Sequence, residues 1–125
     1  MSTSSWKRVL VVEDDPQLRD LYRNALRAAG YAVIAVEDGA DALRQVEQAV
    51  PALVVLDLGL PRLHGRDVHS ELKARADTRD VPIVIVTGGE VSEADAKQFA
   101  CVLRKPCDPY RLVEAVAQCL RRAQT

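Results

Sequence analysis

The chain contains the segment VLVVEDDP at residues 9–16, in which a valine-rich run is followed by three acids and a proline. A continuous apolar run of this length is typical of a strand that is buried on both faces of a sheet. Asp15 and Pro16 then predict the start of a helix, because aspartate is a favoured N-cap and proline fits the first helical position. The segment therefore predicts a buried strand that ends in Glu13, Asp14 and Asp15 and leads directly into a helix.

The same alternation of strand and helix continues along the chain. Strands are expected at residues 9–12, 31–36, 53–57, 81–87 and 101–104. Helices are expected from Asp15 to Gly30, from Asp38 or Gly39 to Pro51, around Val68 and Leu72, over residues 92–98, and along the stripe formed by Leu112, Val113, Val116, Ala117 and Leu120. Five strands alternating with five helices predict an α/β fold, with a doubly wound parallel sheet that is covered by helices on both faces. In such a sheet the ligand site lies beyond the carboxyl ends of the strands.

Length, composition and charge are those of one globular domain. The chain has 125 residues, of which 48% are hydrophobic and 28% are charged, and its net charge is −1. This balance indicates no basic surface for nucleic acid and no polybasic patch for a membrane. The apolar runs are strand-sized and fall far short of the roughly 20 residues that a membrane-spanning helix needs. We therefore expect a single domain over residues 1–125, with an ordered core at about 7–121, in the cytoplasm.

The cysteines and histidines indicate no metal centre and no disulfide framework. The chain has three cysteines at wide spacings, which are expected to be reduced thiols that fill space. His64 and His69 are five residues apart, and this spacing does not place two ligands on one face of a helix. Both histidines are therefore expected at the surface.

Polar residues follow four of the predicted strands. Acids follow the first strand, Asp57 ends the third, Thr87 ends the fourth and Lys105 follows the fifth. A parallel sheet brings these ends to one edge, where clustered carboxylates would repel one another unless a cation joined them. Mg²⁺ suits such oxygen ligands, and a central carboxylate can accept a phosphoryl group as an acyl phosphate. Each residue alone is typical of a helix cap or a loop, and the signal lies in their order along the chain.

Four segments together resemble the receiver domain of two-component response regulators. They are VLVVEDDP at residues 9–16, PALVVLDLGLP at 51–61, PIVIVTG at 82–88 and KP at 105–106. The resemblance covers nearly the whole chain, from about Lys7 to Arg121. It implies a flavodoxin-like fold with the strand order 2-1-3-4-5.

The resemblance also implies a role for each residue at the strand ends. Asp57 matches the phosphoacceptor, and Thr87 and Lys105 match the hydroxyl and the ammonium group that contact the phosphoryl group. Mg²⁺ would be held by Glu13, Asp14, Asp57 and the backbone carbonyl of Gly59. The Lys105–Pro106 peptide bond is expected to be cis. The donor would be a sensor histidine kinase or a phosphotransfer protein, the output would pass to an unknown protein or domain, and the chain would be a monomer or a weak dimer.

The sequence departs from the family at three places. Val102 stands where an aromatic residue usually reports the movement of the switch hydroxyl. The segment between Thr87 and Lys105 is shorter than usual by roughly one helical turn, which predicts a short or irregular fourth helix. Cys107 stands where phenylalanine is common and is expected to be a packing substitution.

Two other classes of function remain open from the sequence. A scaffold that keeps the receiver fold but signals without phosphate would explain Val102 and the short fourth helix. A small phosphohydrolase or phosphotransferase would need a lid and a second acid two residues after Asp57, and Gly59 stands there instead. The leading hypothesis is a phosphorylation-controlled signalling module that assists its own phosphorylation and dephosphorylation, and is not an enzyme with an outside substrate.

Overall fold

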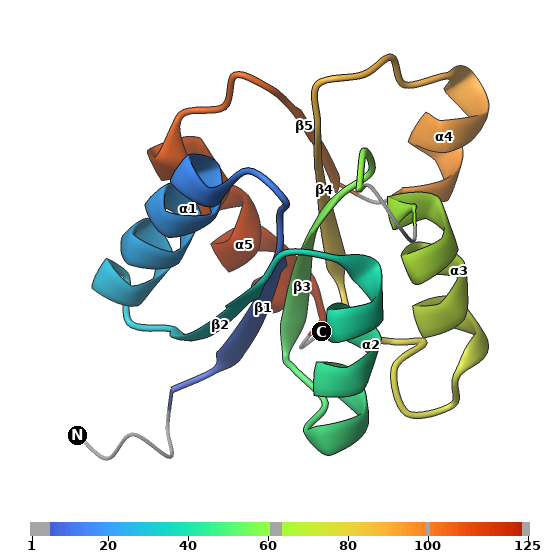
Figure 1. Ribbon diagram of the computed structural model, residues 1–125, viewed down its shortest axis with the longest axis horizontal. Helices are drawn as coiled ribbons and strands as arrows, with labels where there is room; N and C mark the ends of the chain where they lie inside the picture. Colours follow the sequence, from blue (N-terminus) through green and yellow to red (C-terminus); the bar gives the residue numbers. More distant parts are fainter. Residues whose placement is uncertain (1–5, 61–63, 100, 124–125) are drawn as a thin grey trace.

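The computed structural model describes residues 6–60, 64–99 and 101–123 and has the predicted doubly wound α/β architecture (Figure 1). Its sheet is parallel throughout, in the order β2-β1-β3-β4-β5. The strands are β1 (Arg8–Val12), β2 (Ala32–Val36), β3 (Leu53–Asp57), β4 (Ile83–Thr87) and β5 (Cys101–Arg104). The helices are α1 (Pro16–Ala28), α2 (Gly39–Gln48), α3 (Gly65–Ala74), α4 (Glu93–Gln98) and α5 (Pro109–Ala123).

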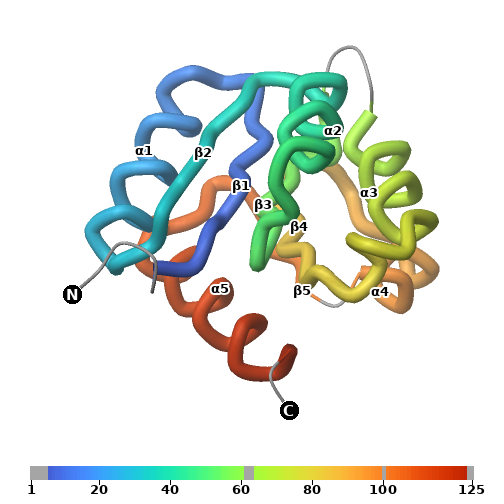
Figure 2. Tube along the Cα trace, turned by 90° about the horizontal axis from the view of Figure 1, so that it is seen from below, coloured from blue at the N-terminus to red at the C-terminus, as the bar shows by residue number. Residues whose placement is uncertain are grey.

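The sheet divides the core into two apolar layers, because successive side chains of a strand point to opposite faces. In β1, Val9 and Val11 pack with α1 and α5, whereas Leu10 and Val12 pack on the other face with α2 and α3. The two groups of helices lie on opposite sides of the sheet in both views (Figures 1 and 2). Burial on both faces is the reason why the central strands are continuous apolar runs rather than alternating ones.

The helix boundaries follow the predicted signals. The Asp15 carboxylate caps α1 by accepting hydrogen bonds from the backbone N–H groups of Gln17 (2.9 Å) and Leu18 (3.3 Å). Gly30 has φ = +101°, a left-handed conformation that other residues rarely adopt, and so it turns the chain out of α1. Asp38 caps α2 through the Asp41 N–H. None of the helices in the described ranges is long and apolar enough to cross a membrane.

The fourth helix is short, as expected, and it carries almost no apolar side chain into the core. Within α4 the one buried residue is Asp95. The Ser92 hydroxyl accepts the Asp95 N–H (3.1 Å), while the Asp95 carboxylate accepts the Ser92 N–H (3.1 Å), which closes a capping box. Phe99 follows as the C-cap and is buried. The helix is therefore held by its polar cap and by one aromatic residue rather than by an apolar stripe.

The surface position expected for His69 is wrong, whereas His64 is exposed as expected. His69 is only 4% exposed, because its ring packs edge-on against Phe99, with the centroids 4.7 Å apart. Phe99 comes from the end of α4, thirty positions along the chain, so the local pattern of α3 does not reveal this contact. All three cysteines are free thiols, and Cys107 packs against the α1–α5 side of the core.

His69 is expected to make the domain less stable below neutral pH. Burial, with a smaller contribution from Lys73, lowers the pKa of the imidazole below its ordinary value of 6.5. The unfolded chain therefore takes up the proton first, and stability is lost as the pH falls from 6.5 through the pKa of the folded state, by at most about 1.4 kcal/mol per pH unit. In urea unfolding, the stability of His69→Phe should fall less, or rise more, than that of the wild type as the pH is lowered from 6.5, and His64→Gln should match the wild type. A curve of wild-type slope for His69→Phe would contradict the prediction.

Candidate functional site

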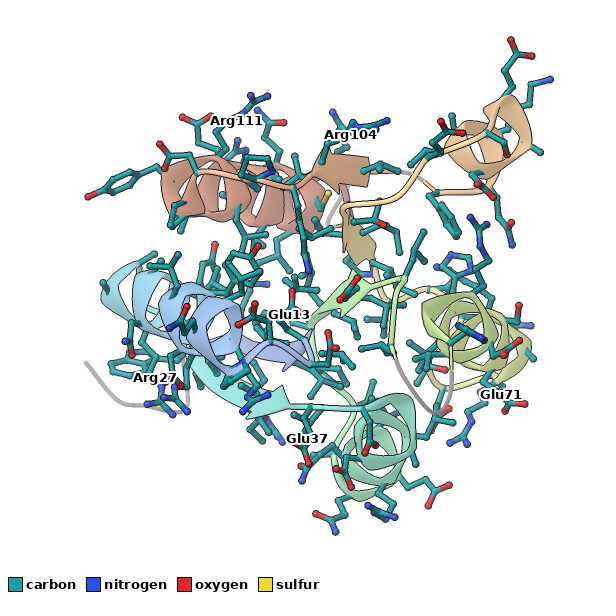
Figure 3. All side chains as sticks on the ribbon, turned by 45° about the horizontal axis from the view of Figure 1, so that its top comes forward. Glu13, Arg27, Glu37, Glu71, Arg104 and Arg111 are labelled. Carbon is teal, nitrogen blue, oxygen red and sulfur yellow. The ribbon has the colours of Figure 1, made fainter. Side chains whose placement is uncertain are left out.

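Three carboxylates meet at the carboxyl ends of β1 and β3. Oxygens of Glu13, Asp14 and Asp57 all lie within 4.8 Å of one another. Glu13 and Asp57 are buried, at 1% and 6% exposed, whereas Asp14 is open to solvent. In Figure 3 Glu13 lies inside the molecule, while Arg27, Glu71 and Arg111 point outward. The Arg19 side chain of α1 fixes the acidic turn by donating to the backbone carbonyl of Glu13 (3.0 Å).

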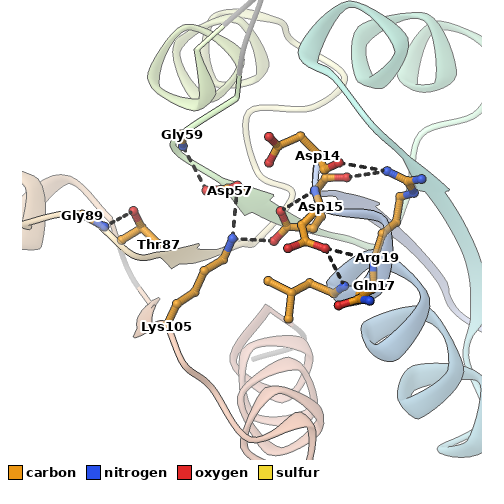
Figure 4. A network of polar contacts seen from close by, with 11 residues as sticks. Asp14, Asp15, Gln17, Arg19, Asp57, Gly59, Thr87, Gly89 and Lys105 are labelled. Atoms are coloured by element: carbon orange, nitrogen blue, oxygen red, sulfur yellow. Dashed lines mark hydrogen bonds and ion pairs between the residues drawn. The ribbon is translucent and has the colours of Figure 1, made fainter.

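The ammonium group of Lys105 joins this cluster from the end of β5 (Figure 4). Its Nζ is 3.2 Å from Asp57 Oδ2 and 2.7 Å from Glu13 Oε1. Both contacts are ion pairs, and the contact with Asp57 is also a hydrogen bond that Lys105 donates. The Lys105 N–H donates to the Thr87 carbonyl (2.9 Å), and the Lys105–Pro106 bond is cis. Backbone pairing thus aims the lysine at the carboxylates.

The cluster of Glu13, Asp14, Asp57 and Lys105 contains three acidic side chains and one basic side chain. Burial raises the pKa of Glu13 from 4.5 to about 7, and the Asp57 charge adds to this effect, whereas Lys105 and the Asp15 N–H oppose it. Burial alone would lower the pKa of Lys105, but Glu13 and Asp57 outweigh burial and raise it. One cation is too little for three carboxylates. Glu13 Oε1 is buried and has an ion pair with Lys105 but no hydrogen bond, so the acidic cluster suits a hard divalent cation.

An open cleft lies over Asp57. It is lined by Asp57, Leu58, Gly59, Arg66, Thr87, Gly88, Gly89, Glu90 and Lys105. Asp57 Oδ1 accepts the Gly59 N–H (2.9 Å), and Thr87 Oγ1 accepts the Gly89 N–H (3.2 Å). Gly59 and Gly89 bring no side chain into the cleft, so a small ligand can approach both Asp57 and Thr87.

The structure thus brings together Glu13, Asp14, Asp57, Thr87 and Lys105, the residues singled out in the sequence. Val102 does not join them. It pairs with Ile85 across the β4–β5 ladder and packs, half-buried, into the core layer of α2 and α3. The charged residues of the cleft that were missed in the sequence are Glu90 and Arg66, the second residue of α3. Arg66 follows Gly65, the first residue of α3, and this position gave no sign of a role. Its contacts are with Asp95 and Phe99, which are distant in the sequence.

A family model described as the response regulator receiver domain matches residues 9–117. The chain belongs to this family. It is therefore a receiver domain of the kind found in two-component signal transduction.

Curated relatives and solved structures agree with this assignment. Transcriptional regulatory protein BaeR of Escherichia coli is 36% identical over 125 residues, which cover 94% of this chain and 49% of BaeR. Protein Rrf1 of Nitratidesulfovibrio vulgaris is 33% identical over 113 residues, which cover 90% of this chain and 82% of Rrf1. The receiver domain of sensor histidine kinase PA1611 from Pseudomonas aeruginosa, solved with a magnesium ion in its active-site cleft, superposes with a TM-score of 0.84 at 27% identity and covers 94% of this chain and 99% of that chain. The receiver domain spans about half the length of the first curated relatives that it matches.

Proposed function

We propose that the receiver domain accepts a phosphoryl group on Asp57 in a Mg²⁺-dependent reaction and passes the signal on by changing conformation. The observation that carries this proposal is the environment of the Asp57 carboxylate. It is buried at the floor of an open cleft, with Lys105 at 3.2 Å and the Thr87 hydroxyl on the same cleft wall. A carboxylate in this position can attack phosphorus, while its neighbours neutralise the charge of the transferred group.

The residues of the cleft have distinct roles in the proposed reaction. Asp57 forms the new bond to phosphorus as the bond between phosphorus and the nitrogen of a phosphohistidine breaks, and the imidazole leaves. Lys105 pairs with one phosphoryl oxygen. Thr87 uses its oxygen to accept the Gly89 N–H, so its own proton is free to donate to another phosphoryl oxygen. No outside substrate is turned over.

Magnesium is the metal that the acidic residues fit best. Glu13, Asp14 and Asp57 would hold it, together with the backbone carbonyl of Gly59. The raised pKa of Glu13 supports this proposal, since a divalent cation would replace the proton that the buried carboxyl group otherwise retains. Once bound, Mg²⁺ would supply positive charge to the phosphoryl oxygens.

Two partners are proposed, one that donates the phosphoryl group and one that receives the signal. The donor is a phosphohistidine on a sensor histidine kinase or a phosphotransfer protein, and the output goes to another protein or domain. The relative BaeR is described as a transcriptional regulatory protein, and this chain matches about half of its length.

The mass of the intact protein tests the proposed chemistry. Incubation with acetyl phosphate and Mg²⁺ should add one phosphoryl group, and EDTA should prevent the addition. The absence of an adduct, together with no binding of the phosphoryl mimic beryllofluoride in the presence of Mg²⁺, would refute the proposal. That result would favour a scaffold that signals without phosphate.

A further inference from the structure

One ion pair connects α4 to the start of α3. The guanidinium group of Arg66, at the start of α3, donates through both terminal nitrogens to the two carboxylate oxygens of Asp95, and the second of these bonds is 2.8 Å long. Asp95 is the one buried residue of α4, and its carboxylate also closes the capping box with Ser92. A helix that is polar all round has little stability of its own, so this pair is a principal anchor of α4.

The same arginine contacts the other end of α4. Its guanidinium carbon lies 5.9 Å from the centroid of the Phe99 ring, which is the C-cap of the helix. Phe99 belongs to the same core layer as Val102. Movement of Arg66 would therefore change contacts at both ends of α4, and the packing of Phe99 in the core layer that also contains Val102.

Arg66 is also placed at the proposed phosphorylation site. It follows Gly65, which lies so close to β3 that an added Cβ would be 2.2 Å from the Asp57 carbonyl oxygen. Its side chain is 49% exposed and lines the cleft with Asp57 and Lys105. Among the residues that line this cleft, the two that carry positive charge are Arg66 and Lys105.

We propose that Arg66 is the residue through which phosphorylation acts on α4: its guanidinium group leaves Asp95 for the phosphoryl group and thereby releases the helix. This inference rests on the proposed phosphorylation of Asp57. A phosphoryl group brings a charge of about −1.5 to −2 and three acceptor oxygens, so it competes strongly with a single carboxylate for an arginine. Lys105 already pairs with Glu13 and Asp57. Arg66 is therefore the second positively charged residue among those that line the cleft.

This exchange of partners would take the place of an aromatic relay. The relay position of β5 is occupied by Val102, which has no aromatic ring that could swing between the surface and the interior. The Arg66–Asp95 pair instead connects the cleft directly to α4, and the release of Asp95 removes the one buried anchor within that helix. The output surface of this receiver domain would accordingly include α4 and its C-cap Phe99.

Calorimetric titration with beryllofluoride in saturating Mg²⁺ tests the proposal, because the two partners of the ion pair should have opposite effects on affinity. Arg66→Ala removes a ligand of the mimic and should weaken binding about tenfold, the usual value of one charge-assisted hydrogen bond. Asp95→Asn removes the competing carboxylate and should tighten binding, while its amide oxygen can still accept the Ser92 N–H. The double variant should bind like Arg66→Ala alone. Arg66→Lys, which keeps the charge without the fork of donors, should fall between wild type and Arg66→Ala.

A second measurement follows α4 itself. Hydrogen exchange of residues 93–98 should accelerate when beryllofluoride binds to the wild type, and it should already be fast in free Arg66→Ala. Arg75→Ala serves as the matched control, since Arg75 makes its ion pairs with Glu47 and Glu71 at the opposite end of α3. Its affinity and exchange should equal those of the wild type.

The outcomes separate this proposal from the assignment of the phosphorylation site. If the wild type does not bind beryllofluoride, the proposed function fails. If the wild type binds, but Arg66→Ala and Asp95→Asn shift the affinity in the same direction or not at all, the role of Arg66 is refuted and the pair is only structural. Tighter binding of the double variant than of Arg66→Ala would likewise refute it, because Asp95 would then act without the arginine.

Discussion

Asp57→Asn is expected to abolish the phosphoryl adduct completely while leaving the domain folded. The amide has nearly the shape of the carboxylate and can still accept the Gly59 N–H, which Asp57 Oδ1 accepts at 2.9 Å. It lacks the nucleophilic oxygen that forms an acyl phosphate. Burial is the main reason why the pKa of Glu13 is raised to about 7, and it persists in the variant, so the loss of the Asp57 charge should lower this pKa only slightly. The free energy of unfolding without Mg²⁺ should therefore not decrease at neutral pH.

Intact mass with acetyl phosphate, urea unfolding and NMR titration of Glu13 measure these three effects. A matched control is Asp41→Asn, since Asp41 belongs to the second acidic group of the described residues, with Glu37 and Asp38. Lys105 makes its ion pairs with Glu13 and Asp57 instead. The Asp41→Asn variant should therefore take up the phosphoryl group like the wild type. An adduct that persists in Asp57→Asn at the wild-type level would show that another residue is the acceptor.

The fold and most of the site could be predicted because their signals are local. The apolar run from Val9 to Val12, the capping residue Asp15 and the stop at Gly30 are each read within a few positions, and the structure has all of them. Parallel pairing then brings the strand ends together, so the placement of Asp57 near Lys105 follows from topology.

The differences arise where distant segments meet. The strand expected from Val81 starts at Ile83, because the Val81 N–H closes a turn on the Thr78 carbonyl (2.9 Å) instead of entering the ladder. The burial of His69 and the pairing of Arg66 with Asp95 both depend on how α4 packs against α3. Arg66 and Asp95 are 29 positions apart, and neither residue stands in a pattern that points to the other. Local periodicity carries no information about such contacts, which appear only once the chain is folded.

Gly65→Ala, at the start of α3, is expected to cause a larger loss of stability than the same substitution at Gly59, Gly88 or Gly89, the glycines that line the cleft. An added Cβ would lie 2.2 Å from the Asp57 carbonyl oxygen and 2.5 Å from the Leu58 Cα. Both are backbone atoms of the segment that carries the proposed acceptor, so no side-chain rotation relieves the clash. The start of α3 would have to move away from the end of β3. We expect the free energy of unfolding to fall by about 3 kcal/mol, at the upper end of the usual cost of overpacking.

The same displacement should impair phosphorylation, because α3 and the loop after Asp57 form one side of the cleft. Gly59→Ala is the matched control for stability, since its Cβ would meet only the Asp57 side chain, at an ordinary 3.6 Å. Urea unfolding should place Gly59→Ala within about 1 kcal/mol of the wild type, the usual range for a glycine whose backbone is compatible with alanine. Equal stability of the two variants would mean that the close approach of α3 to β3 is not required. Retention of the adduct in a destabilised Gly65→Ala would instead separate the packing of α3 from the chemistry at Asp57.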